Sequence, residues 1–239
     1  MKKKIKKIVL NREGKKIYWF GGDIHTHLGV IKEADMQKKE KISMQKGDIG
    51  YVLPATFLDQ LEKIERGPAI MLKKDIGIIL ANIPLDTKTK IVDAGSGCGV
   101  LAAYLARSGA SVTTYEIDEK NAERAKKNAE LLGVVCKFKK KNIACGIDEK
   151  NVDVITLDLG NPWEVFPHAV KSLKRGGMLV VYAPQITQVE KIVQETKEHF
   201  ILIKACEVIE REWVVEAPVL RPKHQGFMHT AFLVFLRKI

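Results

Sequence analysis

Residues 91–99 read IVDAGSGCG and have the composition of a loop that binds a nucleotide-like cofactor. A short apolar run ends in Asp93 and then breaks into alternating Gly95, Gly97 and Gly99, which predicts a strand followed by a tight turn. Because glycine has no side chain, the backbone of such a turn can approach a ligand closely. The dinucleotide-binding pattern G-x-G-x-x-G needs different spacing, with its third glycine three residues after the second. The loop alone therefore leaves the identity of the cofactor open.

Three further polar residues follow later strands of the predicted pattern. Glu116 ends the next strand, where a carboxylate can accept hydrogen bonds from both hydroxyls of a ribose. Asn142 follows a third strand, where its amide can accept from the amino group of an adenine and donate to a ring nitrogen. Asp158 ends a fourth strand and could accept a proton from an amino group of a substrate. Ligands of open α/β sheets bind beyond the carboxyl ends of the strands, so these residues should face one cleft.

A ribose-binding acid at this place serves NAD and S-adenosylmethionine alike, and the phosphate distinguishes the two cofactors. A dinucleotide needs a helix N-terminus that opens onto its pyrophosphate. S-adenosylmethionine has no phosphate and carries a sulfonium cation, with which Asp93 just before the loop is compatible. The pattern Asp-x-Gly-x-Gly-x-Gly followed by Glu116 therefore predicts a methyltransferase. A tight turn without a ligand would explain the glycines but not Glu116, and an aspartate that caps a turn would explain Asp158.

The elements that must position these residues alternate between strands and helices from about residue 73 onward. We expect strands at 90–94, 111–117, 134–140, 152–159 and 178–184, with helices between most of them, one of which covers 165–177. This alternation predicts a mostly parallel sheet that is covered on both faces. The last two strands, near 201–209 and 228–236, have little but a loop between them, which predicts an antiparallel hairpin at the sheet edge. We expect a seven-stranded, Rossmann-like α/β domain over residues 67–239.

The first 66 residues have a different pattern, which predicts a small β-rich domain. Short β-leaning runs are separated by Gly and Asp: KIKKIVLN, KKIYWF, HLGVI and GDIGYVL. The stretch LPATFLDQLEKIERGP then predicts a helix that ends at Gly67-Pro68, which is a suitable domain boundary. We therefore place the boundary between residues 66 and 67.

The charge balance favours an anionic partner such as nucleic acid. Forty Lys and Arg residues stand against 29 Asp and Glu, for a net charge of +11, and the first 16 residues are strongly basic. A basic start can also be a solvated surface that binds nothing. No apolar run approaches the length of a membrane helix, and no apolar segment of a signal peptide follows the first lysines. The four cysteines form no C-x-x-C pair, and the expected setting is the cytoplasm.

Several stretches of the chain resemble the tRNA (adenine-N1)-methyltransferases that modify T-loop adenosines, particularly the archaeal type. In the N-terminal part they are DIHTHLGVI, YVLPATFLDQLEKIERGP and the pair Lys74-Asp75. In the catalytic part they are IVDAGSGCGVLAAYLA, YEID, LDLGNPWEV, LKRGGMLVVYAPQITQV and RPKHQGFMHTAFLVFLRK. The resemblance implies a class I methyltransferase domain that uses S-adenosylmethionine. It also implies tRNA as the partner, with no DNA, and usually a homotetramer.

The resemblance also implies a role for each candidate residue. Four residues of the turn would hold the methionine end of the cofactor: Gly95, Ser96, Gly97 and Gly99. Glu116 would bind the ribose, and Asn142 would lie beside the adenine, where relatives more often have Asp. Asp158 would be the catalytic acid near the target adenine, accepting from its amino group while N1 attacks the methyl group. Removing Asp158 should then raise the barrier by a few kcal/mol, on the order of an oxyanion-hole donor.

The sequence departs from the pattern of this family at three places. Relatives commonly have an aromatic residue or His followed by Pro where this chain has Leu72-Lys73, and often Gln where Ala69 stands. Gly160 replaces a Pro after Asp158. The missing aromatic residue removes a side chain that could help to hold the target base, whereas Gly160 only loosens the loop.

Other residues are weaker candidates for contact with tRNA or a metal. The basic side chains that could contact phosphates are the N-terminal lysines, Arg211, Arg221, Lys223 and His229. His25-Thr-His27 resembles a metal-binding pair, but nothing nearby completes a ligand set, so we expect no metal site. We expect the three tryptophans to pack in the core or at its edge: Trp19, Trp163 and Trp213.

Two rival functions share some of these features. A small-molecule methyltransferase, such as a corrinoid-precursor enzyme, would share the glycine turn and Glu116 but would leave the first 66 residues unexplained. A non-catalytic tRNA-binding subunit is favoured only by the altered segment from Ala69 to Lys73, and such subunits lose the cofactor motif, which here is intact.

Overall fold

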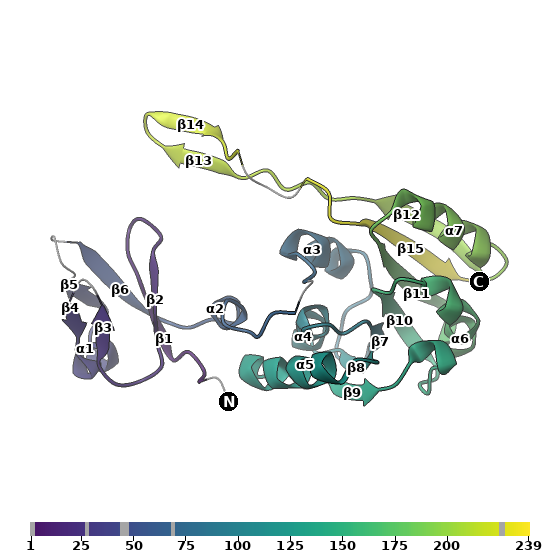
Figure 1. Cartoon of the computed structure of the whole chain (residues 1–239), viewed down its shortest axis with the longest axis horizontal. Helices are drawn as coiled ribbons and strands as arrows, with labels where there is room; N and C mark the ends of the chain where they lie inside the picture. The colour runs from purple at the N-terminus through teal and green to yellow at the C-terminus, as the bar shows by residue number, and fades with distance from the viewer. Residues whose placement is uncertain (1–2, 27–28, 44–47, 68–69, 225–227) are drawn as a thin grey trace. The chain divides into compact units, whose positions relative to one another are not determined.

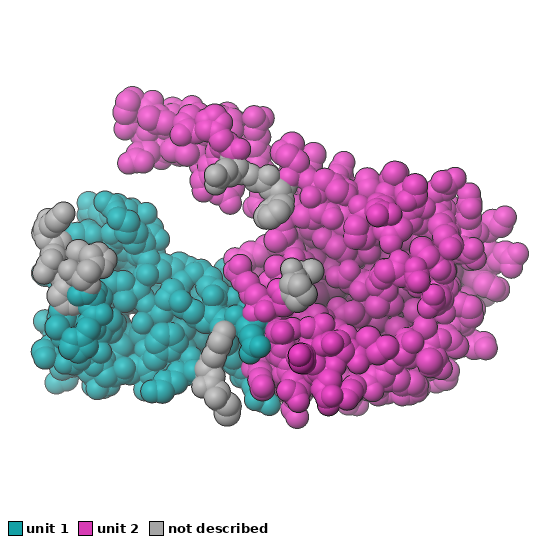
Figure 2. Space-filling view, in the orientation of Figure 1, with its two compact units in different colours: residues 1–65, 130–133 teal, residues 66–129, 134–239 magenta. Residues whose placement is uncertain are grey.

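The computed structural model describes residues 3–26, 29–43, 48–67, 70–224 and 228–239 of the chain. Two compact units are present, one made of residues 1–65 and 130–133 and the other of residues 66–129 and 134–239 (Figure 2). Among the described residues, no helix is both long and apolar enough to cross a membrane.

The first unit is β-rich, as the sequence predicts. Its four-stranded antiparallel sheet has the order β2-β1-β6-β5, and β3 pairs with β4 separately. The strands are β1 (Lys7–Leu10), β2 (Lys16–Trp19), β3 (Ile24–Thr26), β4 (Gly29–Ile31), β5 (Lys41–Ser43) and β6 (Ile49–Pro54). Apolar side chains of the sheet meet Met36 of helix α1 (Glu33–Lys38) in a small core, which also includes Trp19. This core is the local reason for the alternating apolar pattern of the strands.

The helix at the end of the first unit is shorter than predicted. Helix α2 (Phe57–Leu61) begins at Thr56, whose side chain forms a capping box with Asp59. After Leu61 the backbone tightens, because Lys63 N donates to the carbonyl of Gln60 at 2.9 Å, and the helix does not reach Gly67. The Gln60 amide group accepts from Ile5 N and donates to Ile5 O, which fixes the helix to the start of the chain.

The second unit contains a seven-stranded sheet in the order β12-β15-β11-β10-β7-β8-β9. Strands β7 to β11 are parallel to one another, and β15 is antiparallel to both β11 and β12. The strands are β7 (Lys90–Ala94), β8 (Ser111–Glu116), β9 (Lys137–Lys140), β10 (Val152–Leu157), β11 (Leu173–Ala183), β12 (Phe200–Cys206) and β15 (Phe232–Lys238). The predicted Rossmann-like fold with an antiparallel end is therefore confirmed.

Helices cover both faces of this sheet, with α3, α4 and α5 on one side and α6 and α7 on the other (Figure 1). They are α3 (Lys73–Ala81), α4 (Val100–Arg107), α5 (Glu119–Leu132), α6 (Phe166–Ser172) and α7 (Ile186–Thr196). Short 3-10 helices, η2 (Ile143–Cys145) and η3 (Pro162–Val165), follow β9 and β10. Because both faces are covered, β7 and β10 are buried along almost their whole length, and most of their residues are apolar.

Two boundaries in the second unit differ from the prediction. The helix expected over 165–177 ends at Ser172, and strand β11 begins immediately at Leu173. The Nζ of Lys238 donates to the carbonyl of Leu173 at 2.6 Å, which satisfies an acceptor at the helix end. Gly176 has φ of +77°, a left-handed conformation that suits a bend within β11 rather than a helix.

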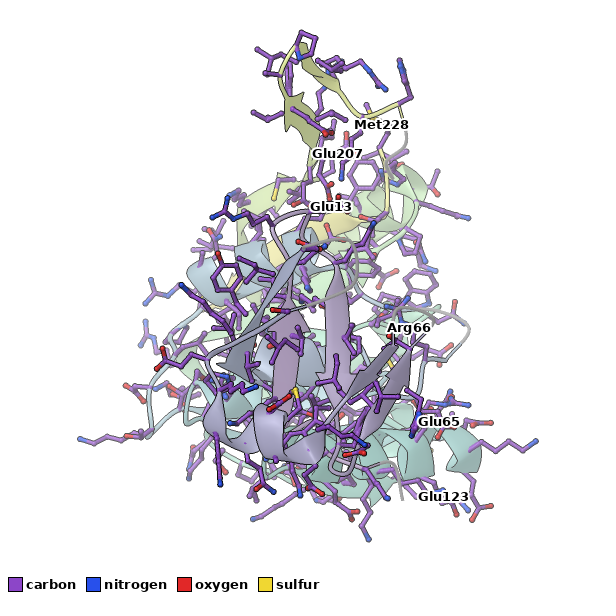
Figure 3. All side chains as sticks on the ribbon, turned by 90° about the vertical axis from the view of Figure 1, so that its left-hand side faces the viewer. Glu13, Glu65, Arg66, Glu123, Glu207 and Met228 are labelled. Carbon is purple, nitrogen blue, oxygen red and sulfur yellow. The ribbon has the colours of Figure 1, made fainter. Side chains whose placement is uncertain are left out.

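The connection between the last two strands of the sheet is also more than the loop that we expected. It contains a separate antiparallel hairpin of β13 (Trp213–Glu216) and β14 (Val219–Pro222), which form their own two-stranded sheet (Figure 1). Glu207 and Met228 lie on the two segments that lead into and out of this hairpin, close to its base (Figure 3).

Candidate active site

The glycine turn joins β7 to α4, and contacts at two of its three glycines leave no room for a side chain. Gly95 has φ of +84°, and a Cβ at this position would lie 2.1 Å from the carbonyl oxygen of Asp158. Gly99, with φ of +79°, is the N-cap of α4, and a Cβ there would lie 3.0 Å from the Cβ of Ala125 in α5. Gly97 also has a positive φ, but a Cβ there would have no neighbour closer than 3.9 Å. Two of the glycines therefore bring the turn close to β10 and α5.

Asp93 is buried beneath the turn and is bound on both sides by hydroxyl groups. Thr114 of β8 donates to its Oδ2 at 2.7 Å, and Thr156 of β10 donates to its Oδ1 at 2.7 Å. Burial raises the pKa of Asp93, and the Glu116 carboxylate raises it further. Both oxygens already have partners within the protein, so Asp93 supports the floor of the site below the turn.

Glu116 connects the end of β8 to the glycine turn. Its Oε2 accepts from Gly97 N at 3.0 Å, and its Oε1 accepts from Ile117 N at 2.9 Å and Asp118 N at 3.0 Å. Three backbone N–H groups thus hold the carboxylate at the carboxyl edge of the sheet, beside the turn, as the sequence predicts.

Ser96 and Asn142 use their side chains within the protein. The Ser96 hydroxyl interacts with the hydroxyl of Thr114 and donates to the carbonyl of Tyr115, and the residue is buried. The hydrogen of the Ser96 hydroxyl is therefore already donated within the protein. The Asn142 Oδ1 accepts from Ala144 N at 3.0 Å and caps η2. A carbonyl oxygen has a second lone pair, so this cap leaves Asn142 able to accept from a ligand as well.

Asp158 follows β10 and lies against the glycine turn, with its backbone N–H donating to the carbonyl of Ala94 at 2.9 Å. The residue keeps contact with solvent. The protein around its carboxyl group nevertheless removes enough water to raise the pKa to about 7, and the charges of Asp93 and Glu116 contribute to that rise. A carboxyl group with this pKa changes its protonation state near neutral pH.

A pocket above the turn brings several of these residues together. Its lining consists of Ile70, Met71, Asp93, Gly95, Ser96, Gly97, Cys98, Val100, Leu101 and Asp158. Two of these side chains are carboxylic acids, and none of these described residues is basic. Apolar walls with two carboxyl groups at the base suit a ligand that has an apolar body and a positive charge. A pyrophosphate would meet repulsion there.

The pair Lys74-Asp75, which the sequence marks only through its family resemblance, is a buried ion pair at the start of α3. The distance from Lys74 Nζ to Asp75 Oδ1 is 2.8 Å, and both side chains also contact Thr230 before β15. Residue spacing could not have revealed this cluster, because its members are distant in the sequence.

Several basic residues that we expected to contact phosphates have partners within the protein. His229 contacts the Glu207 carboxylate and the carbonyl of Pro184, and Lys223 forms an ion pair with Glu212. Near the N-terminus, Lys7 donates to carbonyls at the end of α1, and Lys16 binds Asp59 and Glu62. Arg211 is exposed.

The three tryptophans lie in different surroundings, and only two of them pack against a core. Trp19 is buried in the first unit, and Trp163 packs partly against the core of the second, but Trp213 is 55% exposed on the hairpin instead of packing at an edge. The described residues contain no group of three or more side chains that could hold a metal ion. His27 and Ala69 lie outside the described residues.

A parallel sheet with an antiparallel end, a glycine turn after β7 and an acid at the end of β8 define a class I, S-adenosylmethionine-dependent methyltransferase. The family profile described as "tRNA methyltransferase complex GCD14 subunit" matches residues 62–231. The chain belongs to this family of tRNA methyltransferases.

Two relatives with named activities match most of the chain. The tRNA (adenine(57)-N(1)/adenine(58)-N(1))-methyltransferase TrmI of Methanocaldococcus jannaschii is 32% identical over 89% of this chain and 86% of its own length. The tRNA (adenine(58)-N(1))-methyltransferase TrmI of Thermus thermophilus is 30% identical over 91% of this chain and 89% of its own. Both similarities include the N-terminal unit as well as the catalytic one.

Solved structures show the same fold. A Thermotoga maritima protein described as an S-adenosylmethionine-dependent O-methyltransferase has a TM-score of 0.87 and 28% identity, covering 100% of this chain and 94% of its own. TrmI of Aquifex aeolicus has a TM-score of 0.84 and 23% identity, with 100% and 98% coverage. A precorrin-8w decarboxylase of Methanobacterium thermoautotrophicum has a TM-score of 0.60 and 14% identity, and covers 74% of this chain and 97% of its own. The last two identities establish likeness of fold alone.

Proposed function

We propose that this protein transfers a methyl group from S-adenosylmethionine to N1 of an adenosine in the T-loop of tRNA. The observation that carries the proposal is the position of Asp158, which lies against the glycine turn and lines the same pocket as that turn. The activities named for the M. jannaschii and T. thermophilus relatives support the choice of acceptor.

The residues of the pocket fit S-adenosylmethionine. The chemistry of the lining is acidic and apolar, which matches a cofactor with a sulfonium cation and an α-ammonium group. Gly95, Gly97 and Gly99 would hold the methionine end through backbone atoms, above Asp93 and the backbone of Ser96. Glu116 would accept from the ribose hydroxyls, and Asn142 would meet the adenine ring. When bound, the cofactor supplies an electrophilic methyl group.

Catalysis by the protein itself would consist mainly of positioning and charge stabilisation. The adenine N1 is neutral and has a free lone pair, so the acceptor needs no strong base before it attacks. Holding two reactants in a near-attack geometry is by itself a large source of rate enhancement. In its ionised form, Asp158 would accept a hydrogen bond from the adenine amino group, which orients the base and stabilises the positive charge that the base acquires.

Recognition of tRNA would rely on phosphate contacts and on a base that leaves its stack. The target atom is inaccessible in a folded tRNA elbow, so the base must be turned out at a cost in free energy. Contacts between phosphates and the excess positive charge of the chain would offset that cost. We assign part of this contact to the β-rich domain of residues 1–66 and part to exposed Arg211. With tRNA as its substrate, the protein would work in the cytoplasm.

We further propose that the protein assembles as a homotetramer, and the hairpin supports self-association. Opposite residues of an antiparallel pair point to the same face, so Trp213, Val215, Leu220 and Pro222 form one apolar face. Val215 is 79% exposed and Leu220 is 67% exposed. A two-stranded sheet is marginal by itself, and an exposed apolar face of this kind marks a protein interface. A second copy of the chain is the occupant that we propose.

The test of the catalytic proposal is methyl transfer from labelled S-adenosylmethionine to unmodified tRNA, followed by nucleoside analysis of the product. N1-methyladenosine should form with the wild-type protein, and Asp158→Ala should lower the rate by roughly two to three orders of magnitude, the size of effect seen when a charge-stabilising group is removed. Glu123→Gln, an exposed change on α5, is the matched control and should retain full activity. Methylation at another nucleoside would sink the assignment to adenine N1.

Two alternatives remain as outcomes of the same experiment. The likeness to a protein described as an O-methyltransferase favours a different acceptor atom, which nucleoside analysis would reveal. A corrinoid-type enzyme fits less well, because the corrinoid-type structure covers only 74% of this chain. Cofactor binding without any transfer to tRNA would point to a small-molecule acceptor or a missing partner chain, and absence of cofactor binding would point to a scaffold subunit.

A further inference from the structure

A buried polar cluster joins the start of α3 to both segments that lead to the β13-β14 hairpin. The Lys74 Nζ donates to Asp75 Oδ1 at 2.8 Å, to Thr230 Oγ1 at 2.6 Å and to the carbonyl of Val208 at 2.7 Å. Thr230 Oγ1 donates in turn to Asp75 Oδ2 at 2.8 Å. Every donor of the ammonium group and both oxygens of the carboxylate therefore have a partner. Val208 precedes the hairpin in the chain and Thr230 follows it.

The burial of this cluster indicates that it fixes the arrangement of the segments that carry it, rather than adding to the stability of the fold. The side chains of Lys74 and Asp75 are only 4% and 0% exposed. Two charges at such depth lose nearly all their hydration, and replacing a buried ion pair with apolar residues of similar volume is often neutral or even stabilising. A network of this kind instead selects one arrangement of the segments that carry it, because any other leaves a charge unpaired.

The cluster adjoins one wall of the active site. Ile70 and Met71, which line the pocket with Asp158, lie just before α3 in the chain. The helix start is fixed to them through Leu72, whose carbonyl accepts from Asp75 N at 3.1 Å. On the other side is Tyr182 of β11. Burial raises its pKa to about 12, the Asp75 and Asp158 charges add to the rise, and a hydrogen bond with Thr230 opposes it.

We propose that Lys74, Asp75 and Thr230 are positioning residues for methyl transfer. They hold the wall made by Ile70 and Met71 in place relative to Asp158, and they use the two hairpin segments as the anchor. The acceptor base and Asp158 then meet in one geometry. The expected effect on methyl transfer rests on the proposed function. The fixed position of the pocket wall rests on the hydrogen bonds alone.

The first test replaces the pair by apolar residues of similar length, in the double variant Lys74→Met/Asp75→Leu. We expect its melting temperature to stay within a few degrees of the wild type, since the ion pair adds little net stability. We expect kcat for tRNA methylation to fall at least about tenfold with KM for tRNA nearly unchanged, because a small misplacement of reacting groups is costly. A stable double variant with wild-type kcat would overturn the proposal.

A pair of variants at Thr230 separates the hydroxyl group from the bulk of the side chain. Thr230→Val removes the hydroxyl at constant shape, whereas Thr230→Ser keeps it. We expect kcat to fall in the valine variant and to recover in the serine variant, with KM unchanged in both. Equal losses in the two variants, or losses of kcat that follow the melting temperature, would mean that the cluster is only structural.

A readout independent of activity distinguishes failure of this proposal from failure of the proposed function. Hydrogen exchange of the Asp75 and Ile76 amides, which donate to Leu72, should become faster in Lys74→Met/Asp75→Leu than in the wild type. If the wild type does not methylate tRNA, the proposed function fails, and this exchange still decides whether the cluster fixes the pocket wall. Unchanged exchange would refute the positioning role.

Discussion

Asp158 is a residue whose value in catalysis conflicts with its effect on stability. Its pKa of about 7 in the folded protein is well above the ordinary value of 3.8, because the surrounding protein and two neighbouring carboxylates disfavour its charge. Between those two pH values the folded state binds more protons than the unfolded state, so stability falls as pH rises through that window. Above pH 7 the folded protein carries the whole cost of the charge that the proposed reaction needs.

Replacing Asp158 with Asn should therefore stabilise the protein at high pH while it disables the enzyme. We expect the melting temperatures of wild type and Asp158→Asn to agree near pH 4, and that of the variant to be higher by about 1–3 °C at pH 8, a small shift because the exposed carboxyl group is partly screened. Scanning calorimetry across this range measures it. In parallel, kcat/KM of the wild type should rise with pH to a plateau above about 7. A variant that is less stable than the wild type at pH 8 would contradict this account.

At the scale of elements, the strand–turn–helix unit of β7 and α4 depends on Gly95 more than on Gly97. Both have positive φ, and that conformation alone costs an alanine about 1–2 kcal/mol. At Gly95 the added Cβ also meets the backbone oxygen of Asp158, which cannot move without shifting the end of β10. Overpacking of this kind adds roughly another 1–3 kcal/mol.

Gly95→Ala should accordingly lower the free energy of unfolding by about 3 kcal/mol, and Gly97→Ala by about half as much. Urea denaturation of the two variants side by side measures the difference. Methyl transfer should suffer more in Gly95→Ala, because that clash displaces Asp158. Equal destabilisation would show that the backbone conformation, and not contact with β10, sets the requirement for glycine.

The sheet and the glycine turn could be predicted from the sequence because their causes are local. Strands buried on both faces, such as β10, are mostly apolar, and the turn needs residues that tolerate positive φ. The β13-β14 hairpin was missed because its apolar residues do not pack into the core of the chain. The inward direction of the Ser96 hydroxyl and the contact of Lys74 with Thr230 depend on strands and loops that only the fold brings together.

At the scale of the whole molecule, the hairpin carries an apolar face that a single chain leaves exposed. If a second copy covers its apolar face, a charge placed there should disrupt the assembly, because burying an unpaired carboxylate costs several kcal/mol. We expect Leu220→Glu to reduce the mass in light scattering from that of a tetramer to that of a dimer or monomer. Glu216→Gln lies on the opposite face of the hairpin and should leave the mass unchanged.

The wild type itself provides the decisive control for this prediction. A wild-type protein that is monomeric at micromolar concentration would refute the assembly, whatever the variants do. If the Leu220→Glu variant is still a tetramer, the interface must lie elsewhere on the chain.

The hydroxyl–carboxylate–hydroxyl arrangement at Asp93 has a consequence for how the chain folds. Thr114, Asp93 and Thr156 stand side by side only when β8, β7 and β10 are aligned residue for residue. A slip of one residue in β8 or in β10, the two strands beside β7, would turn its threonine to the opposite face of the sheet. The buried carboxyl group of Asp93 would then lose that partner. The buried Asp93 thus favours the correct alignment of these three strands, because a misaligned strand would leave its carboxyl group without a hydrogen-bond partner. Misaligned sheets are penalised at the place where the active site is to form.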